Sequence, residues 1–445
     1  MIERKATSLE NLRGIRVTVV GLGRFGGGVG VTRWLCGVGA KVTVSDSASA
    51  DDLAESVSLL DQLDVRMHLG SHLKDDFLSA DLLVVNPAVP KHMPLLREAQ
   101  AAGVARTSEI NLFLQSCPCP IIGVTGTAGK STTSAMTTAV LSRRYKTHLG
   151  GNIGGSLLNS LPDIARDHLV VMELSSFQLE DLPLARISPH IAVVTNLANN
   201  HLDRHGTMAA YTSAKMNILK YQNSDDVLIL NSTCDQTRQW AQQAQGHVEW
   251  FDPMGDPFEL QVLGSVNQAN AQAAWSVASQ FGIDRSVATE ALRDYQALPH
   301  RLSLVAEIGG VRFYNDSKST TPAGTIAAME AFQPREVLVI VGGSDKGIPL
   351  DRLASVLCDR AKAVVAIGAM RDKIASAIRA TRTKQLPLLE LAEDLPAAMA
   401  TVVSHADAGD VVLLSPACAS YDMFVNYRQR GNAFVELVGK LASDR

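Results

Sequence analysis

One glycine-rich turn in the chain carries the residue types that bind and transfer phosphate. The stretch IIGVTGTAGKST, residues 121–132, runs from an apolar strand pattern into a turn with two glycines, followed by Lys130 and Ser131. Glycines let backbone N–H groups point at phosphate oxygens, lysine adds positive charge, and the serine hydroxyl is a typical Mg²⁺ ligand. Val124 occupies the position of the usual leading glycine, but none of these groups is lost. The pattern predicts a nucleotide site.

Four further polar residues lie in or just after apolar segments downstream of this turn. Glu173 ends the strand pattern VVMEL, and an acid at the carboxyl end of a parallel strand is well placed to meet a metal ion. His201 and Asp203 lie in NNHLDRH, just after another strand pattern. Lys215, in YTSAKMNIL, has the pattern of an ordinary solvated helix lysine when it is considered alone.

A second glycine-rich turn, GLGRFG at residues 21–26, follows the first strand pattern, and Asp46 ends the next one. This is the arrangement that cradles a diphosphate at a helix N-terminus. Considered alone, it favours an NAD-dependent oxidoreductase. A sugar nucleotide diphosphate fits the same turn, and an empty tight turn is a further alternative.

The elements that must position these residues alternate between strand and helix patterns, which predicts α/β domains with parallel sheets. SCPCP near residue 116 and LPHR at 298–301 interrupt the alternation. We therefore expect three domains, at residues 1–115, 116–298 and 299–445. Strands are expected within 15–20, 41–46, 81–86, 120–126, 168–176, 190–196, 225–231, 311–316, 335–343, 361–368 and 410–420, and a helix is expected within 264–282.

Composition narrows the class of protein. The 445 residues are 46% hydrophobic and 19% charged, with a formal net charge of −4 and no basic stretch, so nucleic acid is not an expected partner. No signal-peptide pattern and no apolar run long enough to enter a membrane is present, which predicts a cytoplasmic protein. Six cysteines do not make a disulfide framework; Cys117 and Cys119 are close, but reduced thiols are expected.

The ordered motifs of the chain resemble those of the Mur ligases, the ATP-dependent amide-forming enzymes of peptidoglycan precursor synthesis. The resemblance runs through nearly the whole chain, in the order GLG, TGTAGKST, GGNIG, ELSSFQLE, NHLDR, AAYTSAK, LPHR, NDSKST, LLSPACASYDMF and QRGNAF. ELSSFQLE and SPACAS are typical of the glutamate-adding members. The family's own loop is TGxxGK[ST], so Val124 is no defect.

The resemblance implies a Rossmann-like first domain, a central P-loop ATPase-type domain and a Rossmann-like C-terminal domain. It implies ATP and Mg²⁺ as cofactors, UDP-N-acetylmuramoyl-L-alanine and D-glutamate as substrates, and an acyl phosphate as intermediate. The first domain then binds UDP rather than a nicotinamide cofactor. A monomer is expected.

The resemblance also assigns roles to residues. Nucleotide contacts are implied for Gly126, Thr127, Gly129, Lys130, Ser131, Thr132, Asn267, Asn270, Arg301 and Asp316. Substrate contacts are implied for Gly23, Arg24, Phe25, Asp46, Asn152, Ser175, Thr320, Lys346, Ser420, Tyr421 and Tyr427. The implied metal ligands are Ser131, Glu173, His201 and Lys215, with Lys215 carbamylated, and the implied catalytic residues are Lys130, His201 and Lys215.

Several positions depart from the family pattern. Ala128, Asn200 and Val266 replace residues that are usually Asn, an acid and His, and Thr321 stands where Asn is common. These departures leave open a catalytically silent regulator that binds a sugar nucleotide. A sister ligase, or a folylpolyglutamate-type ligase, that adds a different amino acid is the nearer alternative.

Overall fold

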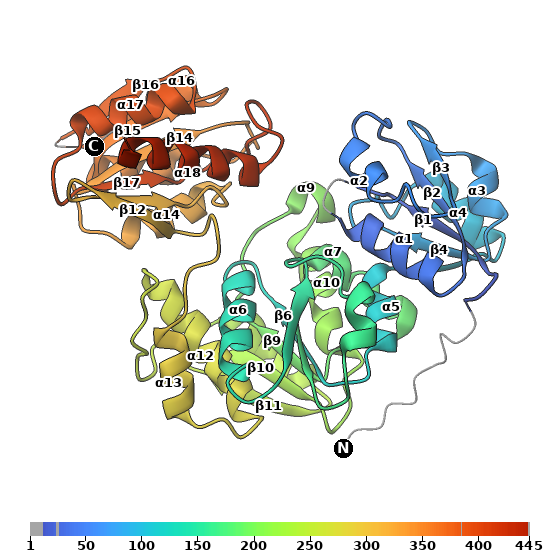
Figure 1. Ribbon diagram of the computed structural model, residues 1–445. Helices are drawn as coiled ribbons and strands as arrows, with labels where there is room; N and C mark the ends of the chain where they lie inside the picture. Colours follow the sequence, from blue (N-terminus) through green and yellow to red (C-terminus); the bar gives the residue numbers. More distant parts are fainter. Residues whose placement is uncertain (1–11, 24–25, 384, 444–445) are drawn as a thin grey trace. The chain divides into compact units, whose positions relative to one another are not determined.

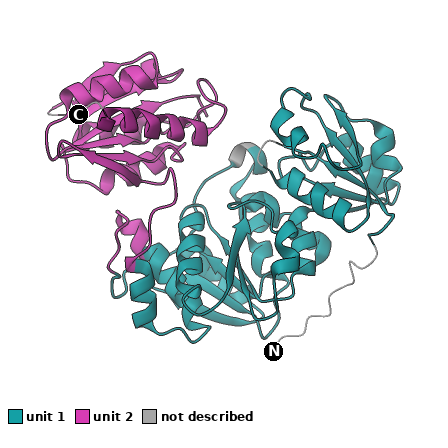
Figure 2. Ribbon diagram, viewed as in Figure 1, with its two compact units in different colours: residues 1–258, 269–292 teal, residues 259–268, 293–445 magenta. Residues whose placement is uncertain are grey.

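Short runs of β-branched and aliphatic residues, each followed by a helix, build three separate sheets (Figure 1). The computed structural model describes residues 12–23, 26–383 and 385–443. The chain divides into two compact units, one of residues 1–258 and 269–292, the other of residues 259–268 and 293–445 (Figure 2). The first two sheets belong to the first unit and the third sheet to the second. The predicted α/β class with largely parallel sheets is confirmed.

The first sheet has five parallel strands in the order β3-β2-β1-β4-β5. Its central strand β1, with the sequence RVTVV, is buried after its first residue, as expected for a parallel strand with both faces covered. The strands are β1 Arg16–Val20, β2 Lys41–Asp46, β3 Val65–Leu69, β4 Leu82–Val85 and β5 Ala105–Thr107. The helices are α1 Gly27–Gly37, α2 Ala54–Ser58, α3 Lys74–Leu78, α4 Pro94–Ala101 and α5 Glu109–Ser116.

The second sheet has six parallel strands in the order β11-β10-β9-β6-β8-β7, so β6 lies in its interior. The strands are β6 Ile121–Thr125, β7 Thr147–Gly151, β8 Leu169–Glu173, β9 Ile191–Val194, β10 Val227–Asn231 and β11 His247–Phe251. The helices after them are α6 Lys130–Leu141, η2 Leu158–Asp163, α7 Ser176–Leu179, α8 Leu182–Ala185, α9 Leu202–His205, α10 Met208–Lys220, α11 Asp235–Arg238 and η3 Gln239–Gln243. Two further helices follow, α12 Ser265–Ser279 and α13 Arg285–Arg293.

The third sheet has six strands in the order β12-β13-β17-β14-β15-β16, and it is not wholly parallel. β12 and β13 form an antiparallel hairpin because Gly309 and Gly310, at φ 59 and 78°, make a two-residue turn that only residues tolerant of positive φ adopt. The strands are β12 Ser303–Ile308, β13 Val311–Asn315, β14 Val337–Gly342, β15 Ala361–Ile367, β16 Leu388–Leu391 and β17 Val411–Leu414. The helices are α14 Pro322–Glu330, α15 Asp351–Arg360, α16 Arg371–Ala380, α17 Leu395–His405 and α18 Tyr427–Ser443.

All eleven predicted strands and the predicted helix at 264–282 are present. The domain boundaries at 115/116 and 298/299 stay predictions. Among the described residues, no helix has the length and apolarity needed to cross a membrane. In each sheet the carboxyl ends of neighbouring parallel strands share one edge, and the predicted residues Asp46, Glu173 and Asp316 lie at or directly after such ends.

Candidate active site

Two glycines in the turn after β6 lie so close to neighbouring side chains that no Cβ fits at either position. All five residues of β6 are buried, and the chain then turns through Gly126 at φ 152° and Gly129 at φ 82°. A Cβ on Gly126 would lie 1.9 Å from Thr195 Oγ1, and one on Gly129 would lie 2.4 Å from Asn270 Oδ1. Both positions therefore require glycine. The second contact also brings the predicted nucleotide residue Asn270 onto the loop.

The segment that follows β9 holds the loop in place. Asn196 accepts a hydrogen bond from Thr127 N at its carbonyl (3.0 Å), and its side-chain amide accepts from Ala128 N (2.9 Å) and donates to Ala128 O (3.1 Å). Thr195 donates to the same Ala128 carbonyl at 2.6 Å. Sequence reasoning missed Asn196. The available signal was an amide residue directly after a strand that neighbours β6 in the sheet.

The loop and the helix after it form an anion-binding arrangement. α6 begins at Lys130, so its first backbone N–H groups and its positive dipole end lie at the loop. Lys130 Nζ donates to Gly126 O and Thr127 O, each at 3.0 Å, which keeps the ammonium over the turn. Together these groups fit a phosphate chain.

Two side chains whose oxygen atoms could bind a metal ion, Ser131 and Glu173, lie beside the loop. Glu173, the last residue of β8, is 1% exposed, and its carboxylate accepts hydrogen bonds from the Ser131 hydroxyl and from Asn152 Nδ2, the latter at 2.7 Å. A carboxylate and a hydroxyl are the ligands that Mg²⁺ takes when it also keeps waters and phosphate oxygens. The donor set therefore fits the implied ion. Among the described residues, no group of three or more His, Cys, Asp or Glu side chains forms a complete protein-only cage.

Lys215 is placed at the loop by α10 and is 1% exposed. Its Nζ donates to Gly126 O at 2.8 Å and to Thr125 Oγ1 at 3.2 Å. Burial lowers the pKa of Lys215 to about 6, with Lys130 adding to the effect and Glu173 opposing it. The local pattern of a solvated lysine is therefore misleading, because this amine is buried and its lowered pKa favours the uncharged form at neutral pH.

Aromatic contacts join His201 to the same region. Its backbone has φ 52°, and its ring lies 5.1 Å from that of Phe177 and 6.5 Å from that of Tyr211. The Tyr211 hydroxyl is 3.2 Å from Thr127 Oγ1, and Lys215 Nζ lies 4.9 Å from the Tyr211 ring centroid. Tyr211 was missed, although it precedes Lys215 by four residues and so shares a face of α10.

His205 is a second histidine of this cluster that sequence reasoning did not select. Its side chain is 2% exposed and its ring stacks on Phe177 at an interplanar angle of 1°. Its nitrogens contact Glu180 Oε1 at 3.1 Å and Ser176 Oγ at 2.9 Å. α9 is thereby fastened to the ELSSFQLE segment.

The first glycine-rich turn and Asp46 are brought together as predicted. Asp46 accepts hydrogen bonds from Gly23 N at 3.1 Å and from Ala48 N at 2.9 Å, so its carboxylate orders two turns at the carboxyl edge of the sheet. The predicted contacts Arg24 and Phe25 lie outside the described residues. A pyridine-nucleotide site and a sugar-nucleotide site are both compatible with this geometry alone.

Ser175 has a visible local role. Its hydroxyl caps α7 by accepting from Gln178 N at 3.3 Å, while Gln178 Oε1 accepts from Ser175 N at 2.9 Å. This reciprocal pair is a capping box, which fixes the start of the helix. Ser175 is separated from Glu173 by one residue, so the cap also orients the end of β8.

In the second unit, two residues predicted to contact the amino acid touch each other. Lys346 Nζ donates to Thr320 Oγ1 at 3.0 Å. Asp316, which follows β13, accepts from Leu302 N at 3.1 Å and from the Ser415 hydroxyl at 2.7 Å. Burial raises the pKa of Asp316 to about 6.

Ser420, Tyr421 and Tyr427 are further predicted residues of the second unit. Ser420 is 2% exposed and Tyr421 is 70% exposed, while the Tyr427 ring lies edge-on to His300 at 6.1 Å. The nucleotide roles predicted for Asn267 and Arg301 in this unit, and for Thr132 in the first unit, stay predictions. Asn267 Nδ2 donates to Leu263 O at 2.7 Å within its own segment.

Arg430 was missed by sequence reasoning and is fully buried. Its guanidinium donates to Ser317 Oγ at 3.0 Å, to Ser317 O at 2.9 Å and to Cys418 O at 3.2 Å. It therefore ties the loop after β13 to the loop after β17. The only signal was its position in the QRGNAF motif.

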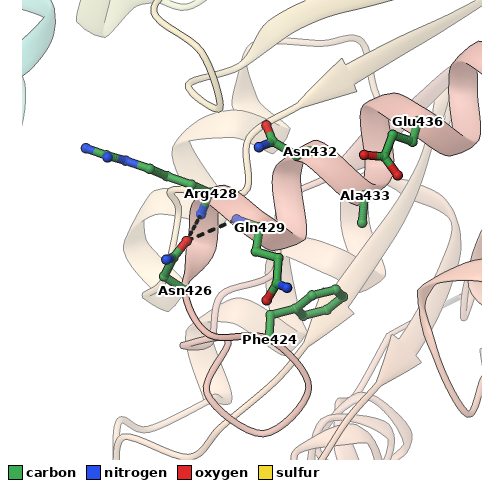
Figure 3. Close-up of a pocket in the computed structure, with 7 residues that line it drawn as sticks. All are labelled: Phe424, Asn426, Arg428, Gln429, Asn432, Ala433 and Glu436. Atoms are coloured by element: carbon green, nitrogen blue, oxygen red, sulfur yellow. Dashed lines mark hydrogen bonds between the residues drawn. The ribbon is translucent and has the colours of Figure 1, made fainter. Parts of the chain in front are cut away.

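A surface hollow of about 480 Å³ lies beside the start of α18 (Figure 3). Asn426 Oδ1 accepts from Arg428 N at 2.9 Å and Gln429 N at 3.0 Å, so three of the lining residues are joined at the start of the helix. None of the predicted site residues lines the hollow, although Tyr427 falls within this turn. The full lining is Phe424, Asn426, Arg428, Gln429, Asn432, Ala433 and Glu436.

Three family models match the chain in order. Residues 15–108 match "Mur ligase MurD-like, N-terminal domain", residues 124–252 match "Mur ligase middle domain", and residues 300–418 match "Mur ligase, glutamate ligase domain". The first glycine-rich turn lies in the first of these segments and the phosphate-type loop opens the second.

Curated relatives match over nearly their whole length. A UDP-N-acetylmuramoylalanine–D-glutamate ligase of Roseiflexus sp. (strain RS-1) is 38% identical, over 96% of this chain and 99% of the relative. One of the same name from Symbiobacterium thermophilum is 36% identical, over 96% of this chain and 98% of the relative.

Solved structures share the fold. UDP-N-acetylmuramate-alanine ligase from Thermotoga maritima has a TM-score of 0.64 at 20% identity, covering 96% of this chain and 100% of its own. A second Thermotoga maritima ligase, MurF, solved in complex with ADP, has a TM-score of 0.60 at 17% identity, covering 98% of this chain and 97% of its own.

Proposed function

This chain belongs to the Mur ligase family, and we propose that it uses ATP to join D-glutamate to UDP-N-acetylmuramoyl-L-alanine in peptidoglycan precursor synthesis. The observation that carries the proposal is the pairing of the phosphate-binding loop with the buried Glu173 carboxylate, in a chain whose relatives carry that ligase name. Three functional domains at 1–115, 116–298 and 299–445 are proposed to bind the UDP substrate, ATP and the amino acid.

The chemistry explains why a phosphate-binding loop is needed. A carboxylate does not acylate an amine at neutral pH, because its oxygen is a poor leaving group. Transfer of the γ-phosphoryl group of ATP to the alanyl carboxylate makes a mixed anhydride; the amine of D-glutamate attacks its carbonyl carbon, and phosphate leaves. The protein's contribution is positioning and charge neutralisation.

Each group at the loop has a proposed part in this step. Lys130 and the first N–H groups of α6 bind the phosphates and draw charge from the transferred group. Ser131 and Glu173 would hold Mg²⁺, which supplies further neutralisation of phosphate charge. Asn270, 3.1 Å from the Thr133 hydroxyl, supports the loop that carries them.

Lys215 is proposed to react with CO₂. Its uncharged Nζ is a nucleophile, so it forms an N–C bond with CO₂ and loses a proton, and a buried amine becomes an anionic carbamate. An anion at this position and His201 would then serve as ligands for a second metal ion. Exchange of Lys215 for Ala should remove most of the activity, and added short carboxylates should restore part of it; unimpaired turnover would rule out the carbamate.

The second unit is proposed to bind D-glutamate. Lys346 offers a charged donor to a carboxylate and Thr320 a hydroxyl beside it, an arrangement that suits a small dicarboxylate. The departures Ala128 and Asn200 spare the backbone contacts of the loop, since Ala128 is held through its main chain and Asn200 Oδ1 accepts from His201 N at 3.0 Å.

Phosphate release with UDP-N-acetylmuramoyl-L-alanine, ATP and Mg²⁺ tests the proposal across a panel of amino acids. We expect release that depends on D-glutamate, with L-glutamate and other amino acids far less effective. Release with a different amino acid would instead identify a sister or folylpolyglutamate-type ligase. Binding of the UDP substrate with no release for any amino acid would identify a silent regulator.

A further inference from the structure

Two thiols face each other in the turn between α5 and β6, outside the groups used above. Cys117 Sγ and Cys119 Sγ are 3.6 Å apart, and Cys117 Sγ also lies 3.7 Å from the Cys119 carbonyl oxygen. Cys117 is half-buried and Cys119 is 3% exposed, while Pro118 between them is exposed to solvent. Both thiols are free, as are the other four cysteines of the chain.

The geometry permits a covalent bond between the two sulfurs. A disulfide bond is about 2.05 Å long, so the sulfurs need to approach by roughly 1.5 Å. Residues two apart span at most about 7 Å between Cα atoms, at the upper end of the range that disulfides bridge. Closure therefore needs side-chain rotation together with an adjustment of the backbone around Pro118.

The two thiols differ in the way that thiol–disulfide exchange requires. A hydrogen bond from Cys119 lowers the pKa of the Cys117 thiol, and the same interaction together with burial raises the pKa of the Cys119 thiol. The more accessible Cys117 therefore has the larger thiolate fraction, and the less accessible Cys119 sulfur lies beside it. Mildly alkaline buffer increases the thiolate fraction of both groups and so favours the reaction.

From this placement we propose that Cys117 and Cys119 form a dithiol site that small-molecule disulfides oxidise to an intramolecular disulfide. The Cys117 thiolate attacks one sulfur of the oxidant, forms a mixed disulfide and expels the first small thiol. The Cys119 thiolate then attacks Cys117 Sγ, closes the bond and expels the second small thiol, while its proton passes to solvent. Two protein thiols are oxidised and one small disulfide is reduced to two thiols.

Oxidised glutathione tests the proposal with the full-length protein in mildly alkaline buffer, followed by intact mass, thiol counting after denaturation and peptide mapping. The wild type should fall from six thiols to four, retain no glutathione and show a Cys117–Cys119 cross-linked peptide, which dithiothreitol reverses. Cys119→Ser should retain one glutathione on Cys117. Cys117→Ser should react about tenfold more slowly at this turn.

Cys36→Ser is the matched control, since Cys36 is also half-buried but burial raises the pKa of its thiol and no second cysteine contacts it within the described residues. It should behave like the wild type at residues 117 and 119. The proposal is overturned if the wild type keeps six thiols, retains glutathione on Cys117, or forms its bridge between other cysteines. The wild-type result decides this even if a serine variant folds poorly.

Discussion

Replacing Lys215 by methionine should stabilise the protein while it abolishes turnover. The unfolded chain holds a proton on this lysine at neutral pH, but the folded protein does not, because burial lowers the pKa of Lys215 from 10.5 to about 6. Releasing that proton between pH 10.5 and neutrality costs about 1.4 kcal/mol per pH unit, or about 5 kcal/mol of folding free energy. Methionine removes this cost and fills the same space with apolar atoms.

The net gain is smaller because two hydrogen bonds are lost. Lys215 donates to Gly126 O and Thr125 Oγ1, and each such bond contributes about 1 kcal/mol. The variant should therefore be more stable by about 3 kcal/mol at neutral pH. Because the pKa of Lys215 is lower in the folded protein than in the unfolded chain, wild-type stability should rise as pH increases from about 6 towards 10.5. The variant should lack this rise.

Urea unfolding monitored by circular dichroism across this pH range, in buffers depleted of bicarbonate, measures both effects. Lys220→Met is the matched control, because Lys220 is an exposed lysine on the same helix and its loss should change stability by no more than about 0.5 kcal/mol. A Lys215→Met protein that is less stable than the wild type, or that keeps the wild-type pH dependence, would refute the reasoning.

Three further substitutions test other contacts. Gly129→Ala should raise the KM for ATP and destabilise the fold by about 1–2 kcal/mol, because its φ is 82° and its Cβ would lie 2.4 Å from a side-chain oxygen. The control is Gly37→Ala, where a Cβ would meet no atom within 4 Å, and it should be neutral or stabilising in thermal melts. Lys346→Met should raise the KM for D-glutamate about 10- to 100-fold with the KM for ATP unchanged, since a charged hydrogen bond contributes about 1.5–3 kcal/mol; equal effects on both constants in steady-state kinetics would contradict the assignment. Lys91→Met should lower the free energy of unfolding in urea by about 2–3 kcal/mol, because the buried Asp181 carboxylate loses its ion-pair partner. Adding Asp181→Asn should recover part of this loss. Additive losses in the double variant would show that the ion pair does not contribute to stability.

The predicted and unpredicted strands differ in where they lie. The eleven predicted strands include every interior strand of the three sheets, and their near-continuous apolar sequences follow from burial on both faces. The six strands not predicted are the two edges of each sheet: β3, β5, β7, β11, β12 and β16. Edge strands are partly exposed, so they carry weaker patterns; β16, for example, has the sequence LLEL with three of its four residues exposed.

The sequence predicted those site residues that belong to a recognisable motif. Lys130 and Ser131 could be selected because they follow a strand in a phosphate-binding loop, and Glu173 because it ends a neighbouring strand. Asn196 and Arg430 could not, because their roles come from tertiary contacts with loops distant in sequence. The state of Lys215 was likewise hidden, since its depressed pKa depends on burial that no local pattern reports.

The most direct test of the proposed acyl phosphate traces the carboxylate oxygens of the substrate by isotope labelling. UDP-N-acetylmuramoyl-L-alanine with both carboxylate oxygens labelled as ¹⁸O is incubated with the enzyme, ATP, Mg²⁺ and D-glutamate, and the released phosphate is analysed by mass spectrometry. If ATP activates the carboxylate as an acyl phosphate, each phosphate carries one labelled oxygen and the new amide keeps the other. Product formed with unlabelled phosphate would contradict the account.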